Sequence, residues 1–144
     1  MSERPFRMLP KLDDQNRHFW QGGEHGELRF LRCGDCSTWI HPPSPRCPEC
    51  LGKNVAPAAV CGRATVLTYT LNHQQWVPAP DHPYCIAIVE MQEQPGLRLM
   101  TNVVNCPAES VHCGMPVRVH FEQHEDVWMP LFEPDPDPRA SDAA

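Results

Sequence analysis

The sequence has no run of about 18 apolar residues, so we expect no membrane-spanning helix. It also lacks an apolar N-terminal segment followed by a small-residue cleavage site. We therefore expect a cytoplasmic protein in a reducing compartment, where disulfide bonds are rare. Positive charge is scarce, because 12 Lys and Arg residues stand against 18 Asp and Glu residues, for a formal net charge of −6. This balance argues against a protein whose main task is to grip nucleic acid.

Motifs that identify common enzymes are absent as well. The chain has no Gly-x-Ser-x-Gly nucleophile elbow, no glycine-rich phosphate loop and no His-Glu-x-x-His. A nucleophilic cysteine needs a nearby base or positive surroundings. Only Cys61, beside Arg63, and Cys113, beside His112, have such neighbours, and adjacent residues of a strand point to opposite faces. We therefore predict no catalytic residue and no independent catalytic activity.

Proline, by contrast, is abundant. Seventeen prolines among 144 residues argue against long helices and for strands joined by irregular segments. The length suits one ordinary domain or two very small ones.

Four of the eight cysteines form two Cys-x-x-Cys pairs, Cys33 with Cys36 and Cys47 with Cys50, with ten residues between the pairs. Two such knuckles supply four thiolates, the soft tetrahedral set that zinc prefers in closed structural sites. Gly34 lies where a tight knuckle can need a positive φ. The segment between the pairs is too rich in proline for a helix, which favours a small zinc ribbon. We predict a structural Zn²⁺ ion held by these four cysteines.

Two other chemistries share this spacing. A pair of disulfides would require an oxidising compartment, which we do not expect for this chain. An iron ion in a rubredoxin-type site would satisfy the same geometry, but nothing in the sequence indicates electron transfer. A closed site with four thiolates leaves no position for water or substrate, so the metal is expected to hold structure and not to catalyse. The other four cysteines do not repeat the ligand spacing.

Residues 1–27 are predicted to form an arm with one short helix. Asp13 can cap a helix over residues 14 to about 21, and a pair of glycines can end it. Phe19 and Trp20 are the only large apolar side chains of this helix. Because so short a helix is unstable alone in water, it must dock through these two residues, either on the body of the protein or on another subunit.

Residues 28–57 are assigned to the ribbon and residues 58–133 to a β-barrel. In the barrel region apolar and polar residues alternate, as Leu67, Tyr69 and Leu71 illustrate, and turn residues separate the runs. The predicted strands cover residues 65–71, 84–91, 97–104, 117–122 and 127–132.

Five strands in about 75 residues, with a longer connection before the fourth, suit a small Greek-key barrel of the OB type. Periodicity alone does not separate this barrel from an SH3-like one. Residues 134–144 begin Pro-Asp-Pro-Asp-Pro and are predicted to form a disordered tail. The predicted fold class is mainly β: an N-terminal helical arm, a rubredoxin-like zinc ribbon, and a five-stranded OB-fold barrel.

The chain carries an ordered series of short motifs: Phe19-Trp20, Gly26-Glu27-Leu28-Arg29, Arg32-Cys33-Gly34-Asp35-Cys36, Pro42-Pro43, Cys47-Pro48-Glu49-Cys50, Gly62, Pro83-Tyr84, Thr101-Asn102, Gly114-Met115-Pro116-Val117 and Pro130-Leu131-Phe132-Glu133-Pro134. In this combination the chain resembles a family of acyl-CoA-associated proteins, known as domain of unknown function thirty-five, in which a rubredoxin-like zinc ribbon is joined to an OB fold. The resemblance covers residues 13–134, and all four of the family's zinc ligands match.

The resemblance implies an accessory subunit and not a self-sufficient enzyme. Members of the family are partners of thiolase-superfamily proteins: acyltransferases, condensing enzymes, and lipid-transfer-protein-like aldolases that shorten acyl-CoA side chains in lipid or steroid degradation. Some are fused to or associated with enoyl-CoA hydratases. The small subunit is expected to bridge subunits, to help shape the CoA channel or to hand an acyl-CoA between active sites. No conserved catalytic residue comes with the resemblance.

The long loop between the first two barrel strands is a candidate contact for a partner or for acyl-CoA, because OB folds commonly bind ligands there. Trp76 has a flat aromatic face, and His73 and His82 offer polar contacts on a segment that prolines stiffen. Equally, Trp76 can fold back over the barrel end with both histidines in solvent. The two histidines can also be read as a proton-transfer pair, although no partner group is identifiable.

Four further residues are candidate contacts of the same kind. Phe19 and Trp20 can dock on a partner, and Arg32 and Lys53, which flank the ribbon, can meet the phosphates of CoA. Surface salt bridges explain the basic residues equally well.

The alternative function is a module that binds single-stranded nucleic acid, because zinc ribbons and OB barrels often serve that purpose. Such a module needs a basic groove and stacking aromatic residues. The acidic balance and the modest aromatic content count against it.

Overall fold

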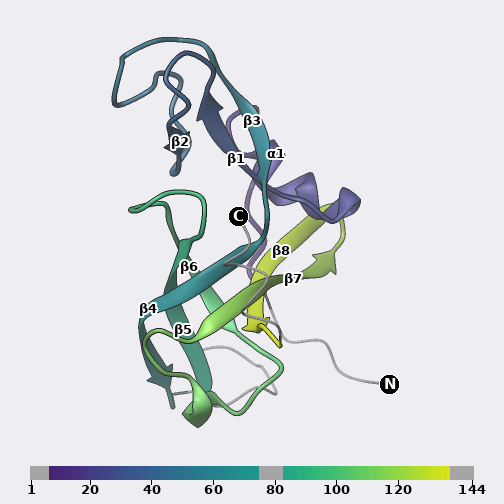
Figure 1. Ribbon diagram of the computed structural model, residues 1–144. Helices are drawn as coiled ribbons and strands as arrows, with labels where there is room; N and C mark the ends of the chain where they lie inside the picture. The colour runs from purple at the N-terminus through teal and green to yellow at the C-terminus, as the bar shows by residue number, and fades with distance from the viewer. Residues whose placement is uncertain (1–6, 75–82, 137–144) are drawn as a thin grey trace.

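The computed structural model describes residues 7–74 and 83–136, and shows a small sheet stacked on a barrel, with a helical arm beside them (Figure 1). Trp76 and His82 lie outside the described residues. No helix within residues 7–74 and 83–136 is long or apolar enough to cross a membrane. The elements are α1 (Arg17–Gln21), η1 (Gly22–His25), β1 (Leu28–Cys33), β2 (Trp39–Ile40), β3 (Val55–Val60), β4 (Arg63–Asn72), β5 (Tyr84–Met91), β6 (Arg98–Val103), η2 (Ala108–Ser110), β7 (Pro116–His124) and β8 (Val127–Pro134).

Strands β4 to β8 close into a barrel with the order β4-β5-β6-β8-β7. Neighbouring strands are antiparallel except β6 and β8, which are parallel where Val103 pairs with Phe132. Numbered within the barrel, the order is 1-2-3-5-4, which is the Greek-key arrangement of an OB fold. The predicted fold class is confirmed: a chain of mostly strands, with a short N-terminal helix, a ribbon that carries the cysteine cluster and a closed five-stranded barrel.

Strand β4 contains a β-bulge that changes which residues face the core. Val66 and Thr68 pair with consecutive residues of β5, and Leu67 is the extra residue between them. Before the bulge, the buried residues are Ala64 and Val66, both even-numbered. Beyond it the alternation shifts, and Tyr69 remains 38% exposed. The apolar face that alternation predicts over this strand is therefore only partly buried.

The ribbon sheet, with the order β2-β1-β3, meets the barrel at a sharp turn. Strand β3 pairs with β1 as far as Val60, and β4 begins at Arg63, so the expected boundary after residue 57 lies inside β3. Gly62 lies between the two strands with a φ of +84°, and a Cβ at this position would lie 2.7 Å from Cγ1 of Val119. Both the left-handed backbone and the close approach require glycine.

The arm has a shorter helix than the sequence predicts. Asp13 Oδ1 accepts hydrogen bonds from the backbone N–H groups of Gln15 and Asn16, at 2.8 and 2.9 Å. These residues form a turn, however, and regular α-helix begins only at Arg17.

The C-terminal end of the barrel extends past residue 134. Strand β8 includes Pro134, and Asp135 is buried. The backbone N–H of Asp135 donates to Pro116 O at 3.0 Å, and its carboxylate lies 3.6 Å from Arg63 Nη1. Because these contacts join residues far apart in the sequence, the proline-rich composition of the segment could not predict them.

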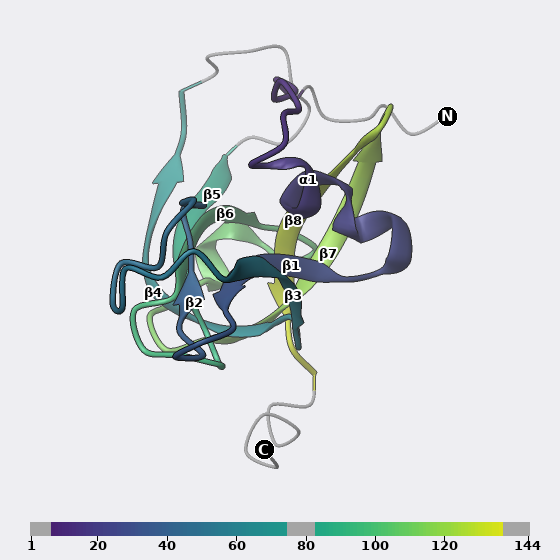
Figure 2. The same cartoon turned by 90° about the horizontal axis from the view of Figure 1, so that it is seen from above.

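Arm, ribbon and barrel share one hydrophobic core. Phe19 of α1, Phe30 of β1 and Phe132 of β8 belong to the same buried cluster. Phe19 is 5% exposed and stacks on Phe30, with ring centroids 5.9 Å apart and planes 13° apart. Trp20 meets Phe19 edge-on at 4.8 Å and is half-buried. The arm therefore docks on the protein's own body, and Figure 2 shows α1 beside β8.

One side chain of the barrel also pairs with the edge of the ribbon. Gln94, in the β5–β6 hairpin, accepts a hydrogen bond from the Trp39 N–H at 2.9 Å and donates one to Trp39 O at 3.1 Å. These two bonds resemble the pair of backbone hydrogen bonds that a neighbouring antiparallel strand would form with the edge of β2. Nearby, Glu93 accepts a hydrogen bond from the Cys61 N–H at 2.6 Å. The hairpin therefore fixes the ribbon relative to the barrel.

Phe19→Ala should lower the free energy of unfolding by about 3 kcal/mol or more, because it removes a buried ring that contacts Phe30 and His41. Urea unfolding measures this change. Met8→Ala, at a position 79% exposed, is the control and should change stability by less than about 0.5 kcal/mol. A loss below about 1 kcal/mol for Phe19→Ala would show that the arm is not part of the core.

Candidate metal centre and apolar groove

The four predicted ligands converge in the ribbon. The sulfurs of Cys33, Cys36, Cys47 and Cys50 all lie within 4.8 Å of one another. The Cys33–Cys50 pair is 3.6 Å apart and the Cys36–Cys47 pair 3.5 Å apart, and none of the four forms a disulfide. Zn–S bonds of about 2.3 Å in a tetrahedron separate the sulfurs by about 3.8 Å. The arrangement therefore fits a metal ion held by four thiolates.

The two knuckles repeat one hydrogen-bond pattern, which explains how both pairs of sulfurs come to point at one centre. In the first knuckle the Ser37 N–H donates to Cys33 O at 2.9 Å, and the Cys33 N–H donates to Thr38 O at 2.9 Å. In the second knuckle the equivalent bonds run from Leu51 N–H to Cys47 O and from Cys47 N–H to Gly52 O, at 2.9 and 3.0 Å.

Gly34 lies close to the side chain of Asn54, and its backbone is not left-handed. A Cβ at this position would lie 2.5 Å from Nδ2 of Asn54, whose backbone O accepts a hydrogen bond from the Gly34 N–H at 2.7 Å. The prediction of a positive φ at Gly34 is wrong. The left-handed residues are Ser37 and Leu51, with φ values of 67° and 63°, each directly after the second cysteine of its knuckle.

Hydrogen bonding shifts the pKa values of two of the four thiols in opposite directions. Hydrogen bonds with the side chain and backbone of Thr38 lower the pKa of the Cys36 thiol to about 6. The backbone N–H of Gly52 favours a thiolate at Cys50, yet hydrogen bonding with Cys33 and the other thiols raises the pKa of Cys50 to about 12. Four sulfurs this close cannot all ionise unless a cation lies among them. A divalent metal supplies that charge, so the chemistry of the donor set agrees with its geometry.

The two basic residues that flank the ribbon differ in their surroundings. Arg32 lies over the Trp39 ring, 4.6 Å from its centroid, and its Nε donates to Ser37 O at 3.1 Å. Its guanidinium therefore stabilises the ribbon through a cation–π contact and a backbone hydrogen bond. Lys53 is exposed next to the second knuckle.

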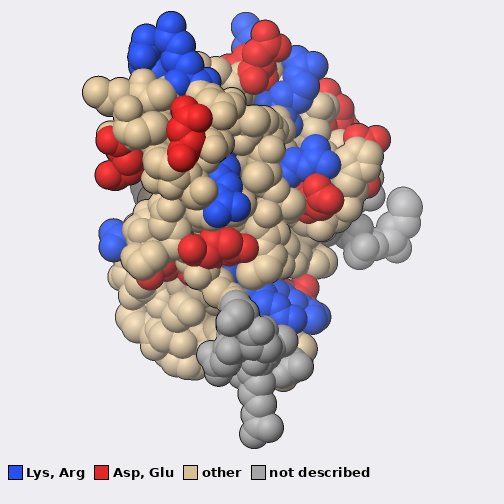
Figure 3. All heavy atoms as spheres, turned by 45° about the horizontal axis from the view of Figure 1, so that its top comes forward, with Lys and Arg blue, Asp and Glu red and all other residues tan. Residues whose placement is uncertain are grey.

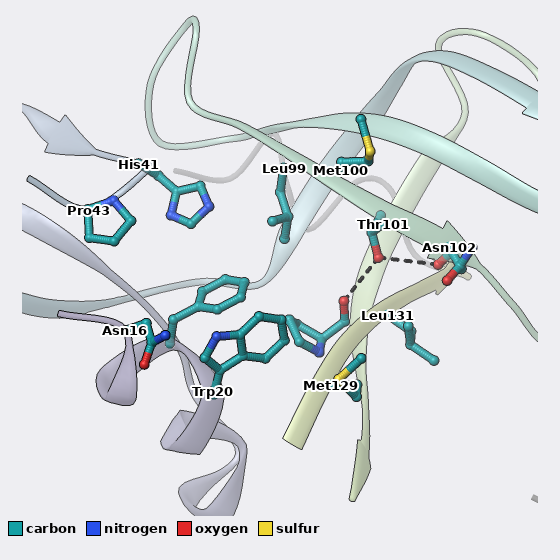
Figure 4. A pocket seen from close by; sticks show the side chains of 12 residues that line it. Asn16, Trp20, His41, Pro43, Leu99, Met100, Thr101, Asn102, Met129 and Leu131 are labelled. Atoms are coloured by element: carbon teal, nitrogen blue, oxygen red, sulfur yellow. Dashed lines mark hydrogen bonds between the residues drawn. The ribbon is translucent and has the colours of Figure 1, made fainter. Parts of the chain in front are cut away.

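A second feature lies in the barrel wall, where strands β6 and β8 share few backbone hydrogen bonds. The only residues of these two strands that pair with each other are Val103 and Phe132. Next to them, the Val104 N–H donates to Phe132 O at 2.7 Å. Pro130 has no N–H to offer. Instead, Thr101 Oγ1 donates to Pro130 O at 3.0 Å (Figure 4). A side-chain bond thus supplements the short backbone ladder between the two strands.

An apolar groove of about 410 Å³, which we call the seam groove, lies at this part of the barrel wall. Strands β6 and β8 form one wall, and the arm and the ribbon segment after β2 form the other (Figure 4). Within residues 7–74 and 83–136, no Lys, Arg, Asp or Glu residue lines it. The lining residues are Asn16, Phe19, Trp20, His41, Pro43, Leu99, Met100, Thr101, Asn102, Met129, Pro130 and Leu131.

Two histidines are packed beside the arm. The His41 ring lies 4.6 Å from the Phe30 ring and 5.1 Å from the Phe19 ring. Burial lowers the pKa of His41 to about 4, and nearby His18 adds to this shift. Burial also lowers the pKa of His18, with a further contribution from Arg29. Among the described residues, neither His18 Nε2 nor His41 Nδ1 has a hydrogen-bond partner. Both histidines are therefore neutral parts of the packing at neutral pH.

Among the expected contact residues that the structure describes, only Phe19 and Trp20 line the seam groove. His73 is exposed at the end of β4, and Arg32 and Lys53 belong to the ribbon surface. Sequence analysis missed the β6 and β8 residues of the groove. The one available signal was Pro130, a proline inside an apolar strand.

The two cysteines considered as nucleophiles lack activating surroundings. Burial raises the pKa of the Cys61 thiol, and the neighbouring Glu93 raises it further, although the backbone N–H of Arg63 acts in the other direction. Cys113 is exposed in the connection before β7.

Comparison with known proteins identifies both halves of the fold. The family model described as "ChsH2, rubredoxin-like zinc ribbon domain" matches residues 20–56, and the model described as "ChsH2, C-terminal OB-fold domain" matches residues 58–122. A chain of the solved structure named "Ltp2-ChsH2(DUF35) aldolase" is 31% identical, with a TM-score of 0.78, and the match covers 88% of this chain and 98% of that chain. The chain belongs to the ChsH2-type DUF35 family.

Three further relatives of this DUF35 protein carry functional names. It is 31% identical to the probable enoyl-CoA hydratase alpha subunit of Thermomonospora curvata, over 91% of this chain and 41% of that protein. It is 31% identical to the 3-oxo-4,17-pregnadiene-20-carboxyl-CoA hydratase alpha subunit of Mycobacterium tuberculosis, over 89% of this chain and 40% of that protein. It is 34% identical to a DUF35 domain-containing scaffold protein of Methanocaldococcus jannaschii, over 65% of this chain and 66% of that protein. The chain spans about two fifths of the length of the two hydratase subunits.

Cys47→Ser should abolish metal binding, because Cys47 is fully buried and is one of four ligands. Mass spectrometry of metal content should find about one metal ion per chain in the wild-type protein and almost none in the variant. Cys113→Ser replaces an exposed cysteine outside the cluster and should leave the metal content unchanged. Equal metal content in Cys47→Ser and the wild type would rule out the four-thiolate site.

His41 should make the stability of the DUF35 protein depend on pH. Between its ordinary pKa of 6.5 and its folded value of about 4, the unfolded chain binds a proton that the folded chain does not, so stability falls as the pH falls. We expect the free energy of unfolding to drop by about 2 kcal/mol between pH 7 and pH 4.5, allowing for partial exposure of the ring.

Urea unfolding at several pH values tests this expectation, with metal content measured at each pH to separate loss of metal from titration of His41. His41→Phe keeps an aromatic ring and should remove most of the drop. His73→Phe, which replaces an exposed histidine, should leave the drop in stability unchanged. An unchanged pH dependence in His41→Phe would contradict the prediction.

Proposed function

We propose that this DUF35 protein is a non-catalytic accessory subunit that binds a thiolase-superfamily partner, either a lipid-transfer-protein-like aldolase or an acyltransferase, and supports acyl-CoA handling. The observation that carries the proposal is the match to 98% of the chain in the Ltp2-ChsH2(DUF35) aldolase, at 31% identity. Nearly the whole of that chain has a counterpart in this fold. The described residues support the same division of labour: the surroundings of Cys61 raise the pKa of its thiol, and four thiolates would close the metal site without an open position.

The names of the relatives suggest how such a subunit serves acyl-CoA chemistry. Adding water across the double bond of an enoyl-CoA gives a β-hydroxyacyl-CoA. Aldol cleavage of that product breaks the bond between the α- and β-carbons, and gives a carbonyl compound and a shorter acyl-CoA. Proteins similar to this chain are named for both kinds of enzyme. We propose that the subunit keeps an acyl-CoA near the partner's active site between two such steps, in lipid or steroid side-chain degradation.

The surface of the subunit offers several contacts for this role. Trp20 is half-buried, and Lys53 and His73 are exposed, so we propose these three as contacts for the partner or for acyl-CoA. Phe19 and Arg32 contribute indirectly, because Phe19 packs in the core and Arg32 holds the ribbon through Trp39.

We propose that the metal is zinc and that its role is structural. Four cysteine thiolates are the ligand set of closed zinc ribbons, and such a site leaves no coordination position for substrate. When bound, zinc would offset part of the negative charge of the four thiolates and fix the two knuckles. No chemical step on the acyl-CoA passes through it.

The distribution of charge does not favour the nucleic-acid alternative. Basic and acidic side chains are interspersed on the face that Figure 3 shows. Several arginines lie within ion-pair distance of carboxylates, as the salt-bridge interpretation expects: Arg29 with Glu27, Arg63 with Asp135, Arg98 with Glu90, and Arg118 with Glu133. A continuous basic track for a phosphate backbone would require these side chains to be free.

Co-expression with a thiolase-like protein from the same genome tests the proposed function. We expect a stable complex in size-exclusion chromatography, and acyl-CoA turnover that the partner alone shows weakly or not at all. Cys47→Ser, which disrupts the ribbon, should reduce both, whereas Cys113→Ser should change neither. The absence of a complex together with unchanged turnover after stoichiometric mixing would refute the proposal, as would acyl-CoA turnover by the isolated subunit.

A further inference from the structure

We propose that the seam groove binds the uncharged hydrocarbon part of an acyl thioester. This inference rests on the proposed function and names the part of the substrate that the subunit itself contacts. The groove lies where β6 and β8 are sparsely paired: Val103 and Phe132 are in register, and beside them a side-chain bond runs from Thr101 to Pro130 O. Its volume of about 410 Å³ is within the range of about 300–1,000 Å³ that is usual for small-molecule sites.

The chemistry of the lining selects an uncharged occupant. None of the lining residues carries a formal charge at neutral pH, because burial keeps His41 neutral. The polar side chains of the barrel wall are already satisfied within the protein: Thr101 bonds to Pro130 O, and Asn102 donates to Cys85 O at 2.9 Å. The phosphates of CoA would lose their hydration here without gaining a charged partner. A hydrocarbon body would instead gain free energy as water leaves both surfaces.

The groove also combines a rigid aromatic wall with adaptable side chains. Trp20 presents its ring from the arm, opposite Met129 on β8 (Figure 4). Met100 lines the groove and is 68% exposed, so its side chain is accessible to a ligand. Methionine side chains have several rotatable bonds and adjust to irregular apolar shapes. The groove can therefore accept a ring system or a branched chain without repacking the barrel core.

NMR titration of the ¹⁵N-labelled chain tests the inference directly. The two probes are 4-androstene-3,17-dione, a rigid ring system, and S-octanoyl-N-acetylcysteamine, a straight-chain thioester. We expect at least one of them to shift the amide signals of Leu99 to Asn102, Met129 and Leu131 in a saturable way, with micromolar affinity. Met100→Glu should weaken binding by about tenfold or more, because it places a carboxylate beside the apolar ligand.

Tyr69→Glu is the matched control, since Tyr69 is also an exposed apolar residue of the barrel but does not line the groove. It should leave the affinity unchanged. The inference is overturned if neither probe binds, if the shifts map elsewhere, or if Met100→Glu binds as tightly as the wild type.

Two outcomes separate this inference from the proposed function. If the chain forms its complex with a thiolase-like partner, and Met100→Glu disrupts that complex while neither probe binds, the groove is a protein-docking site. The inference then fails and the proposed function stands. If a probe binds in the groove but no partner complex forms, the groove assignment is supported and the accessory-subunit role is not.

Discussion

Four cysteine sulfurs within 4.8 Å of one another impose the constraint on which the ribbon depends. Four thiolates repel one another at this distance, and four thiols would leave small polar groups packed together with little to hold them. A divalent cation resolves the conflict, and it turns two short knuckles with few apolar residues into a rigid unit. The apolar cluster around the site consists only of Cys33, Cys47 and Ile40, with Leu31 and Val55 partly buried beside them. Packing of this size cannot hold the two knuckles without the metal.

The order that the metal imposes reaches the barrel by two routes. Strand β2, directly after the first knuckle, is paired by Gln94 of the β5–β6 hairpin, and Phe30 of β1 packs in the core with Phe19 and Phe132. The ribbon segment after β2 then places His41 and Pro43 at the seam groove. The groove wall that contains His41 and Pro43 therefore depends on the ribbon. The opposite wall, formed by β6 and β8, depends on the barrel. A structural metal can affect binding at the groove in this way without touching the ligand.

Local chemistry in the sequence predicted the parts of the structure that depend on local spacing. The two Cys-x-x-Cys pairs predicted the metal ligands, and apolar alternation predicted the barrel strands and their number. What the sequence could not show depends on contacts between distant residues. The bulge at Leu67 shifts the inward face of β4 from even-numbered to odd-numbered residues, the ion pair with Arg63 holds Asp135 against the barrel, and the sparse pairing at Pro130 lies beside the groove. Spacing also misassigned the positive φ of the first knuckle to Gly34, whereas the left-handed residue there is Ser37.

The metal, the ribbon and the groove wall form one mechanical unit. Hydrogen–deuterium exchange of the metal-loaded and the chelator-treated chain tests it most directly. We predict faster exchange after metal removal in the ribbon, and also in the β5–β6 hairpin around Gln94 and in α1, while β7 and β8 remain protected. Faster exchange confined to residues 33–55 would contradict the account, because the ribbon would then unfold without affecting the groove.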